Sequence, residues 1–397
     1  MALPLSLRSA LRLQASLVLA FMAASSVPSP LYAIYRAEWG FSPATLTAVF
    51  AVYVFSLLLA LLMLAPLSDH LGRRPVVLGA IALELLSIAL FLGADSVGML
   101  MAARLVQGAA TGVALSVLGA GIADLDPRRA PLINSTAPLL GMCAGALASS
   151  LLATYAPAPL RLVYLLLFLV LLAQAWLAWR LPETVNARPG VLRSLRPRLA
   201  VAPNARRDFV RALPLDIAVW ALGGYLLSLG PTLARQVTGG QSPLVGGLML
   251  AALTGSGALG SLLLRARSAR SLMQLGSAAL AAGMGLVLAS TFMPSAGLFF
   301  SGIVVAGLGF GVGFLGALRT VMADTLPAQR ASLMAAFLVL SYCAFSLPAL
   351  AAGAAVTHFG LVATAQVYGA LVMLLALVAL LGTRARKAAL RTAACPG

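Results

Sequence analysis

Twelve apolar stretches, each about 20 residues long, follow one another along the chain. A helix of about 20 apolar residues crosses the hydrocarbon core of a bilayer, and in lipid only a helix satisfies its own backbone hydrogen bonds. The pattern therefore predicts an all-α membrane protein with 12 transmembrane helices. The stretches lie near residues 15–36, 45–67, 75–94, 97–122, 131–154, 162–180, 214–234, 243–264, 272–292, 296–321, 332–356 and 361–382.

Composition excludes the soluble classes. Of the 397 residues 61% are hydrophobic and 9% are charged, with a mean hydropathy of +1.00, whereas soluble domains carry about 25% charged residues. The apolar residues form unbroken runs and do not alternate, which argues against a β-barrel. We expect the first stretch to be retained as a span, because it is longer than a signal peptide, contains Pro28 and Pro30, and runs on into further spans.

The net charge of +17 does not point to nucleic acid, because the basic residues occupy short gaps between apolar stretches. Cytoplasmic loops of membrane proteins are rich in Lys and Arg. Placing both termini in the cytoplasm puts 23 of the 27 basic residues there. Arg36, Arg161 and Arg235 then lie at the outer side and Arg104 inside the membrane. The three cysteines have no spacing typical of metal ligands, so neither a metal site nor a disulfide is expected.

The longest polar gap divides the spans into two sets of six. We expect an N-terminal bundle at 1–180, a cytoplasmic linker at 181–213 and a C-terminal bundle at 214–397. The segment 206–211 suits either a short helix on the inner leaflet or a solvated tether. Residues 123–127 and 323–327 share the pattern A-D-x-x-P, and prolines near 28–32 and 227–231 suggest helix breaks in corresponding spans. Such an echo indicates duplication, which predicts two pseudo-symmetric six-helix bundles with a substrate cavity between them.

The loop after the second span, residues 66–75, reads P-L-S-D-H-L-G-R-R-P. It resembles the signature loop of the major facilitator superfamily, G-x-L-x-D-R-x-G-R-[RK]. Asp69, Gly72, Arg73 and Arg74 match this pattern, whereas Ala65 replaces the leading glycine and His70 the first arginine. The resemblance implies a twelve-helix carrier, the major facilitator fold.

The residue types in this loop suit a conformational latch. Gly72 permits a turn with positive φ, and Arg73 can reach an acid on a neighbouring helix, for which Asp124 is the candidate. We expect Asp69, Gly72, Arg73, Arg74 and Asp124 to hold the halves in the outward-facing state and to separate when the carrier opens inward. The alternative is that these are ordinary cytoplasmic charges.

Two charged residues fall inside predicted spans. Residues 104–108, R-L-V-Q-G, are similar to the R-x-x-Q-G element frequent in proton-coupled members of that superfamily. An unpaired charge in a membrane costs several kcal/mol, so Glu84 and Arg104 are candidates for proton coupling. The alternatives are a neutral Glu84 hydrogen-bonded to a neighbouring helix, and structural pairing of Arg104.

Two further elements bear on the branch of the superfamily. Residues 145–150, G-A-L-A-S-S, depart from the G-P-x-x-G-G of drug:proton antiporters, which weakens antiport. Residues 182–184, P-E-T, resemble the element that closes the N-terminal half in the drug-exporter branch. Tyr32, Gln107, Tyr225 and Tyr342 are candidates for lining the substrate cavity.

The resemblance and the residues together predict a proton-coupled transporter in the drug:proton antiporter-like branch. It would export small amphipathic molecules as a monomer in a cell inner membrane, without a cofactor. Uptake of a small organic acid held by Arg104 stays open as the alternative. A non-transporting scaffold is the alternative of another class, and an enzyme is not expected, because no nucleophile, metal set or acid pair is evident.

Overall fold

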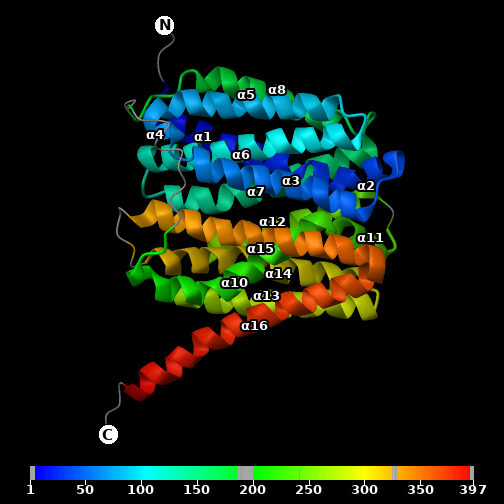
Figure 1. Ribbon diagram of the computed structural model, residues 1–397, viewed down its shortest axis with the longest axis vertical. Helices are drawn as coiled ribbons and strands as arrows, with labels where there is room; N and C mark the ends of the chain where they lie inside the picture. Colours follow the sequence, from blue (N-terminus) through cyan, green and yellow to red (C-terminus); the bar gives the residue numbers. More distant parts are fainter. Residues whose placement is uncertain are drawn as a thin grey trace. The chain divides into compact units, whose positions relative to one another are not determined.

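The computed structural model describes residues 5–185, 189, 200–240, 242–323, 325 and 329–393, and the regular structure of these residues is helical (Figure 1). The first half of the chain forms α1 (Leu7–Ser26), α2 (Pro28–Trp39), α3 (Pro43–Leu64), α4 (Leu67–Leu71), α5 (Arg73–Leu92), α6 (Val97–Leu125), α7 (Ala130–Tyr155) and α8 (Leu162–Ala178). The second half forms α10 (Pro203–Ser228), α11 (Gly230–Thr238), α12 (Pro243–Leu263), α13 (Ala269–Phe292), α14 (Ala296–Met322), α15 (Arg330–Phe359) and α16 (Leu361–Ala393).

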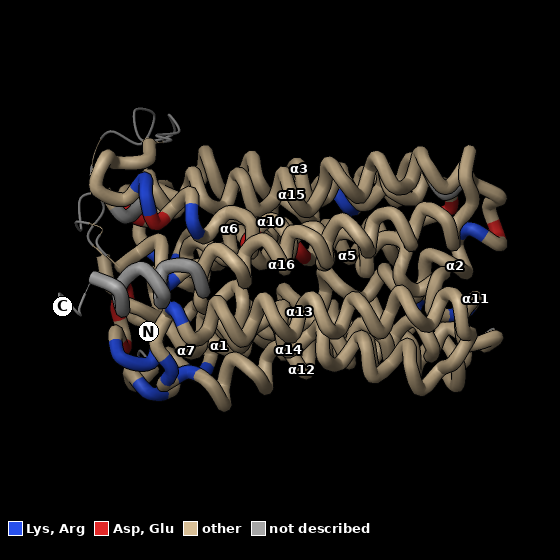
Figure 2. The backbone as a smooth tube through the Cα atoms, turned by 90° about the horizontal axis from the view of Figure 1, so that it is seen from below, with Lys and Arg blue, Asp and Glu red and all other residues tan. Residues whose placement is uncertain are grey.

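The helices match the twelve predicted spans. Within the described residues, 11 helical segments are long and apolar enough to cross a membrane, with Leu7–Trp39 counted as one, and α8 adds a shorter apolar helix of 17 residues. Charged residues are sparse along the helix lengths and gather towards helix ends (Figure 2). The prediction of an all-α membrane protein is confirmed.

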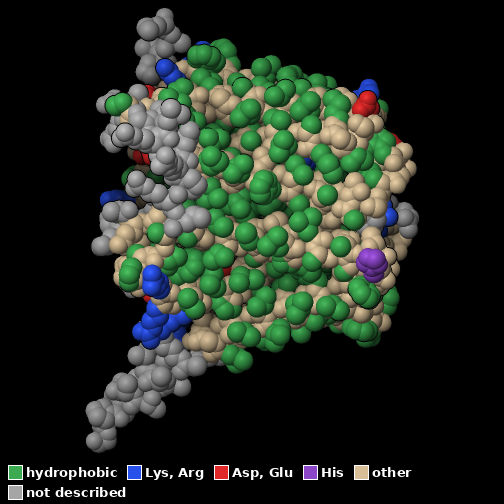
Figure 3. Space-filling view, in the orientation of Figure 1, with side chains coloured by type: hydrophobic (Ala, Val, Ile, Leu, Met, Phe, Trp, Pro, Cys, Tyr) green, Lys and Arg blue, Asp and Glu red, His purple; other side chains and the backbone are tan. Residues whose placement is uncertain are grey.

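Apolar stripes lie on the outer faces of several helices, and hydrophobic side chains cover much of the surface in Figure 3. On α16 the exposed residues recur every three or four positions, as one face of a helix requires. The large apolar residues among them are Val367, Leu371, Leu374, Leu377, Val378 and Leu381. Such a face is unfavourable in water and matches lipid chains.

The chain divides into two compact units. The first comprises Met1–Arg198 with Gln241–Ala251, and the second comprises Leu199–Gly240 with Ala252–Gly397. Helix α10 begins at Pro203, within the stretch assigned to the linker, so residues 206–211 belong to α10 and form no separate surface helix. Linker residues 186–188 and 190–199 lie outside the described residues, as do Asp324, Leu326 and Pro327 of the repeated A-D-x-x-P pattern.

Both predicted helix breaks are present. Helix α1 ends at Ser26 and α2 starts at Pro28, and α10 ends at Ser228 where α11 starts at Gly230. Proline has no N–H to donate to the carbonyl four residues earlier. Each break therefore leaves main-chain carbonyls that need other partners in a membrane.

Helix α6 lies close against α3 because glycine faces the contact. A Cβ atom on Gly108 would overlap the main-chain carbonyl oxygen of Tyr53. Ser56 Oγ, on α3, donates to the carbonyl of Leu105 at 2.6 Å. This close contact fixes the part of α6 that carries Arg104 and Gln107.

Candidate functional site

The break between α1 and α2 is completed by side chains from α6. Because Pro28 lacks an N–H, the carbonyl of Ala24 has no helical donor, and Gln107 Nε2 donates to it at 3.1 Å. The neighbouring carbonyl of Ser25 accepts from Arg104 Nη1 at 3.0 Å. The R-x-x-Q pair of α6 thus satisfies two carbonyls of α1 at the break.

Arg104 is fully buried, with no exposed surface. Its Nε donates to the Tyr32 hydroxyl at 2.6 Å, and Nη1 donates to Gln107 Oε1 at 2.6 Å. The guanidinium carbon lies 5.0 Å from the ring centre of Tyr53 and 5.9 Å from that of Phe91, within the range of cation–π attraction. Nη2 is the guanidinium nitrogen left without a hydrogen bond in the described part of the chain.

Glu84, on α5, is also fully buried. Its Oε1 accepts a hydrogen bond of 3.1 Å from Gln107 Nε2, while Oε2 has no hydrogen-bond partner among the described residues. The structure shows no ion pair between Glu84 and Arg104. The Gln107 amide stands between them, with its oxygen towards the cation and its nitrogen towards the acid. One neutral side chain therefore separates the acid from the cation, and a change in the charge of Glu84 would alter the electrostatic field at Arg104.

Four predicted residues therefore meet in one place, namely Glu84, Arg104, Gln107 and Tyr32. The two other tyrosines lie in the second unit. Tyr225 is buried on α10 and stacks on Tyr368 with ring centres 4.7 Å apart. Tyr342, on α15, packs against Trp220 at 4.7 Å. A role for either tyrosine in binding substrate stays a prediction.

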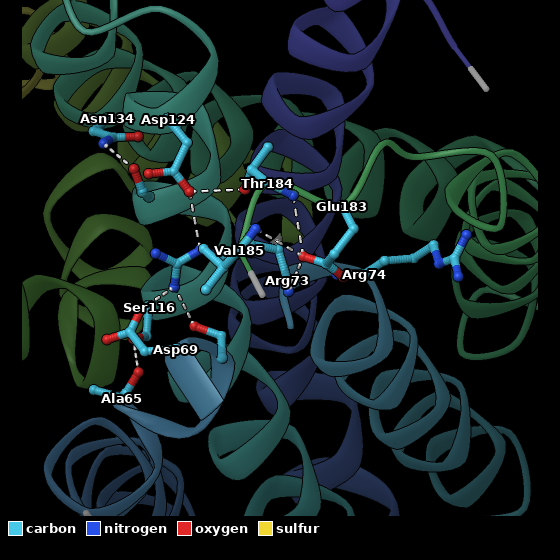
Figure 4. A network of polar contacts seen from close by, with 12 residues as sticks. Ala65, Asp69, Arg73, Arg74, Ser116, Asp124, Asn134, Glu183, Thr184 and Val185 are labelled. Carbon is cyan, nitrogen blue, oxygen red and sulfur yellow. Dashed lines mark hydrogen bonds and ion pairs between the residues drawn. The ribbon is translucent and has the colours of Figure 1, made fainter. Parts of the chain in front are cut away.

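A second polar cluster surrounds Arg73, at the start of α5 (Figure 4). Its side chain is 10% exposed. Arg73 Nε lies 3.0 Å from Asp124 Oδ2, and Nη1 lies 2.7 Å from Asp69 Oδ1. Nη1 also donates to the hydroxyl of Ser68. The structure brings together Asp69, Arg73 and Asp124, all in the first unit, and their action as a latch stays a prediction.

The P-E-T element belongs to this cluster, which the sequence did not reveal. The Glu183 carboxylate accepts from the main-chain N–H groups of Arg73 at 2.6 Å and Arg74 at 3.1 Å, so it caps the N-terminus of α5. Thr184 Oγ1 donates to Asp124 Oδ2 at 2.9 Å. Arg74 takes part through its backbone, and its exposed side chain extends away from Arg73 in Figure 4.

Gly72 makes this capping possible. It has φ of +97° and ψ of 156°, as the expected turn with positive φ requires. A Cβ atom at this position would lie 2.6 Å from Glu183 Oε2. Any larger residue would therefore meet both an unfavourable backbone conformation and the capping carboxylate.

Asp216 was not among the residues predicted from the sequence. With a seventh span that starts at 214, this acid would lie at a membrane boundary. Helix α10 instead runs from Pro203 to Ser228, so Asp216 lies near its middle. The side chain is fully buried, and Oδ2 accepts from the hydroxyl of Ser341 on α15 at 2.8 Å. An acid close to an apolar run was the available signal.

No group of three or more His, Cys, Asp or Glu side chains that could hold a metal ion is found among the described residues. The acids described above are accompanied by amide, hydroxyl and guanidinium groups.

Comparison with known proteins identifies the family. A family model described as Major Facilitator Superfamily matches residues 15–347, which is most of the chain. The chain belongs to the major facilitator superfamily. Its long apolar helices make it a multi-pass membrane protein.

Relatives of known structure share the fold of the superfamily. The crystal structure of the nucleoside transporter NupG (D323A mutant) is similar with a TM-score of 0.73 and 13% identity, covering 95% of this chain and 100% of that one. The crystal structure of the human organic anion transporter MFSD10 (TETRAN) is similar with a TM-score of 0.69 and 17% identity, covering 94% of this chain and 100% of that one. At these identities the likeness concerns the fold alone.

A curated relative matches part of the chain. An MFS-type transporter, paaT, of Penicillium rubens is 28% identical over 151 residues. This match covers 37% of the present chain and 27% of the relative, so the chain spans about a quarter of that protein's length. The activity, the substrate and the direction of transport of this chain are therefore matters for proposal.

Proposed function

We propose that the chain is a proton-coupled exporter of small amphipathic molecules that works by alternating access, in the drug:proton antiporter-like branch of the superfamily. The observation that supports this most is the fully buried group Glu84–Gln107–Arg104. Charged groups inside a membrane are costly and are kept where they act on ions, protons or substrates. An acid with one free oxygen beside a hydrogen-bonded arginine is suited to hold and release a proton.

The coupling works through Gln107 in this proposal. When Glu84 is ionised, its charge attracts Arg104 and orients the amide between them, because electrostatic attraction is strong where water is absent. When Glu84 takes up a proton, that attraction falls and the hydrogen bond between Glu84 and Gln107 weakens, whereas Gln107 and Arg104 keep their contacts with the α1 carbonyls. The protonation of one carboxyl group is thereby linked to the packing of α5 against α6.

The second candidate function is uptake of a small organic acid held by Arg104. Arginine recognises a carboxylate best through two parallel hydrogen bonds. Here Nε and Nη1 already donate to Tyr32, Gln107 and the Ser25 carbonyl. One nitrogen, Nη2, is left for a substrate, which favours the first function over the second.

The same proposal covers the orientation and the latch. We propose a monomer in a cell inner membrane. The distribution of the basic residues supports placing both termini in the cytoplasm. The contacts of Arg73 with Asp69 and Asp124, with Gly72 and Arg74 in the same turn, then hold the outward-facing state and separate on inward opening. The likeness of residues 182–184 to the exporter element supports export.

The test uses purified protein in liposomes that contain a pH-sensitive dye, with an imposed proton gradient. Proton movement triggered by lipophilic cations in the wild type, and lost in Glu84→Gln, is the expected result. Movement triggered by organic acids alone would replace export by uptake and place Arg104 at the centre. If folded protein moved no protons with any compound, coupling would be refuted, and facilitated diffusion or a scaffold role would take its place.

A further inference from the structure

Asp216 is a buried acid that the proposed coupling does not use. It has no exposed surface and lies near the middle of α10. One oxygen accepts from Ser341, whereas Oδ1 has no hydrogen-bond partner among the described residues. The four ion pairs of the described residues do not include it. A carboxylate in a membrane interior needs a positive partner to remain charged.

Four aromatic side chains gather one helical turn from this acid. Trp220 follows Asp216 by four residues on α10, and therefore lies on the same helix face. Its ring centre is 4.7 Å from Tyr342, 5.6 Å from Phe314 and 5.8 Å from Phe345. We call Trp220, Phe314, Tyr342 and Phe345 the Trp220 cluster.

The backbone of unit 2 holds the Trp220 cluster and Asp216 together. Ser341, the hydrogen-bond partner of Asp216, directly precedes Tyr342 on α15, and Phe345 follows one turn later. A Cβ atom on Gly224 would overlap the carbonyl oxygen of Phe345, so α10 and α15 are in close contact here. Trp220 itself is half-buried.

Aromatic faces beside a carboxylate attract organic cations. The negative face of an aromatic ring attracts a cation within about 6 Å, most strongly for Trp, and groups of such rings recognise quaternary ammonium ligands. The indole N–H of Trp220 interacts with the Asp216 carboxyl group, which ties the acid to the aromatic ring. The arrangement thus offers a charge and an apolar wall within one helical turn.

We propose that Asp216 and the Trp220 cluster bind the cationic group of an organic cation with apolar substituents, such as an ammonium or phosphonium compound. Asp216 supplies the opposite charge, and the four rings contact the substituents. This inference rests on the proposed function, since it names the substrate class of an amphipathic-molecule exporter. It places substrate recognition in the second unit and proton coupling in the first.

The test measures equilibrium binding of radiolabelled tetraphenylphosphonium to full-length protein in detergent. Triphenylphosphine oxide, which has similar rings and no net charge, serves as the neutral probe. Asp208→Asn is the matched control, because Asp208 is on the same helix and pairs with Arg211 at 2.9 Å, away from the cluster. We expect Asp216→Asn to weaken phosphonium binding by about tenfold or more. Asp208→Asn should bind as the wild type does, and the neutral probe should be unaffected.

The aromatic contribution is tested by a pair of variants at one position. Trp220→Leu should weaken phosphonium binding several-fold, whereas Trp220→Phe should retain most of it, because an aromatic face remains. If Asp216→Asn does not fold, the comparison of Trp220→Leu with Trp220→Phe still tests the proposed site. Equal phosphonium binding by Trp220→Leu and Trp220→Phe, wild-type affinity in Asp216→Asn, or equal loss of both probes would overturn the proposal.

The binding assay needs no proton gradient, so its outcome does not depend on whether the proposed proton-coupled export is correct. Phosphonium binding that depends on Asp216, without proton movement in liposomes, would refute coupling and leave the binding site. If transport is proton-coupled but Asp216→Asn binds phosphonium as the wild type does, the proposed exporter function stands and the proposed binding site at Asp216 is refuted.

Discussion

The side-chain amide of Gln107 donates to the main-chain carbonyl of Ala24 at 3.1 Å, at the place where residue 28 would donate if it were not proline. The same nitrogen contacts Glu84, and the amide oxygen accepts from Arg104. One neutral side chain therefore links a helix break to an acid and a base. Removal of this side chain tests the whole arrangement.

Gln107→Leu should lower the stability of the folded protein. The substitution leaves buried groups of Ala24, Glu84 and Arg104 without this partner, at a cost of about 1–3 kcal/mol for each group left unpaired. Thermal unfolding in detergent measures the change. Gln174→Leu is the control, since half-buried Gln174 loses one hydrogen bond to Ser16. Equal midpoints for the two variants would show that the Gln107 contacts contribute little.

Arg104→Lys should abolish most transport although the charge is retained. A lysine ammonium cannot reproduce the fixed fork through which Arg104 contacts Tyr32, Ser25 and Gln107. We expect the initial rate of substrate-driven proton movement to fall by about tenfold or more. Tyr32→Phe removes one hydroxyl and should fall between this variant and the wild type. A wild-type rate in Arg104→Lys would mean that charge alone suffices.

Gly72→Ala adds only a methyl group, but it should destabilise the protein clearly. Its φ of +97° is unfavourable for alanine, and its new Cβ would lie 2.6 Å from Glu183 Oε2. Gly79→Ala is the matched control on α5, where an added Cβ meets nothing within 4 Å. We expect a loss of about 1 kcal/mol or more at position 72 and little change at 79. Comparable unfolding midpoints would argue against the capping turn.

The two adjacent arginines should differ sharply. Arg73→Ala removes the contacts with Asp69 and Asp124. Arg74→Ala removes an exposed side chain and keeps the hydrogen bond to Glu183, because the main-chain N–H of residue 74 donates it. In the latch proposal, Arg73→Ala shifts the protein towards the inward-open state and Arg74→Ala does not.

The shift can be followed by the labelling rate of a cysteine introduced at the inner end of a helix, in a background without Cys143, Cys343 and Cys395. An impermeant maleimide applied from the inner side should react several-fold faster in Arg73→Ala than in the wild type. Unchanged labelling in Arg73→Ala would remove the latch while leaving the cluster as a structural feature.

The spans were predictable because apolar length alone defines them, and both helix breaks followed from proline chemistry. That Glu84 and Arg104 fall inside the membrane, and so are candidates for function, followed from their positions within predicted spans. The bridging position of Gln107 could not be predicted, because it depends on where the Ala24 carbonyl lies relative to α6.

Two other features were out of reach of the sequence. Glu183 caps the start of α5 from 110 residues away, and no local pattern encodes so distant a contact. Asp216 was overlooked because polar residues at 204–211 hid the true start of α10 at Pro203. In both cases the information lies in tertiary packing, which overrides local signals at helix ends.

The way the α1 break is completed also limits which parts of the first unit can move separately. Sliding α6 along α1 would leave the carbonyls of Ala24 and Ser25 without donors in a medium that supplies none. Helices α1 and α6 should therefore move as one rigid body in the proposed transport cycle. Spectroscopic labels placed on α1 and α6 would keep a constant separation, and would serve as a fixed ruler against which the movement of other helices can be measured.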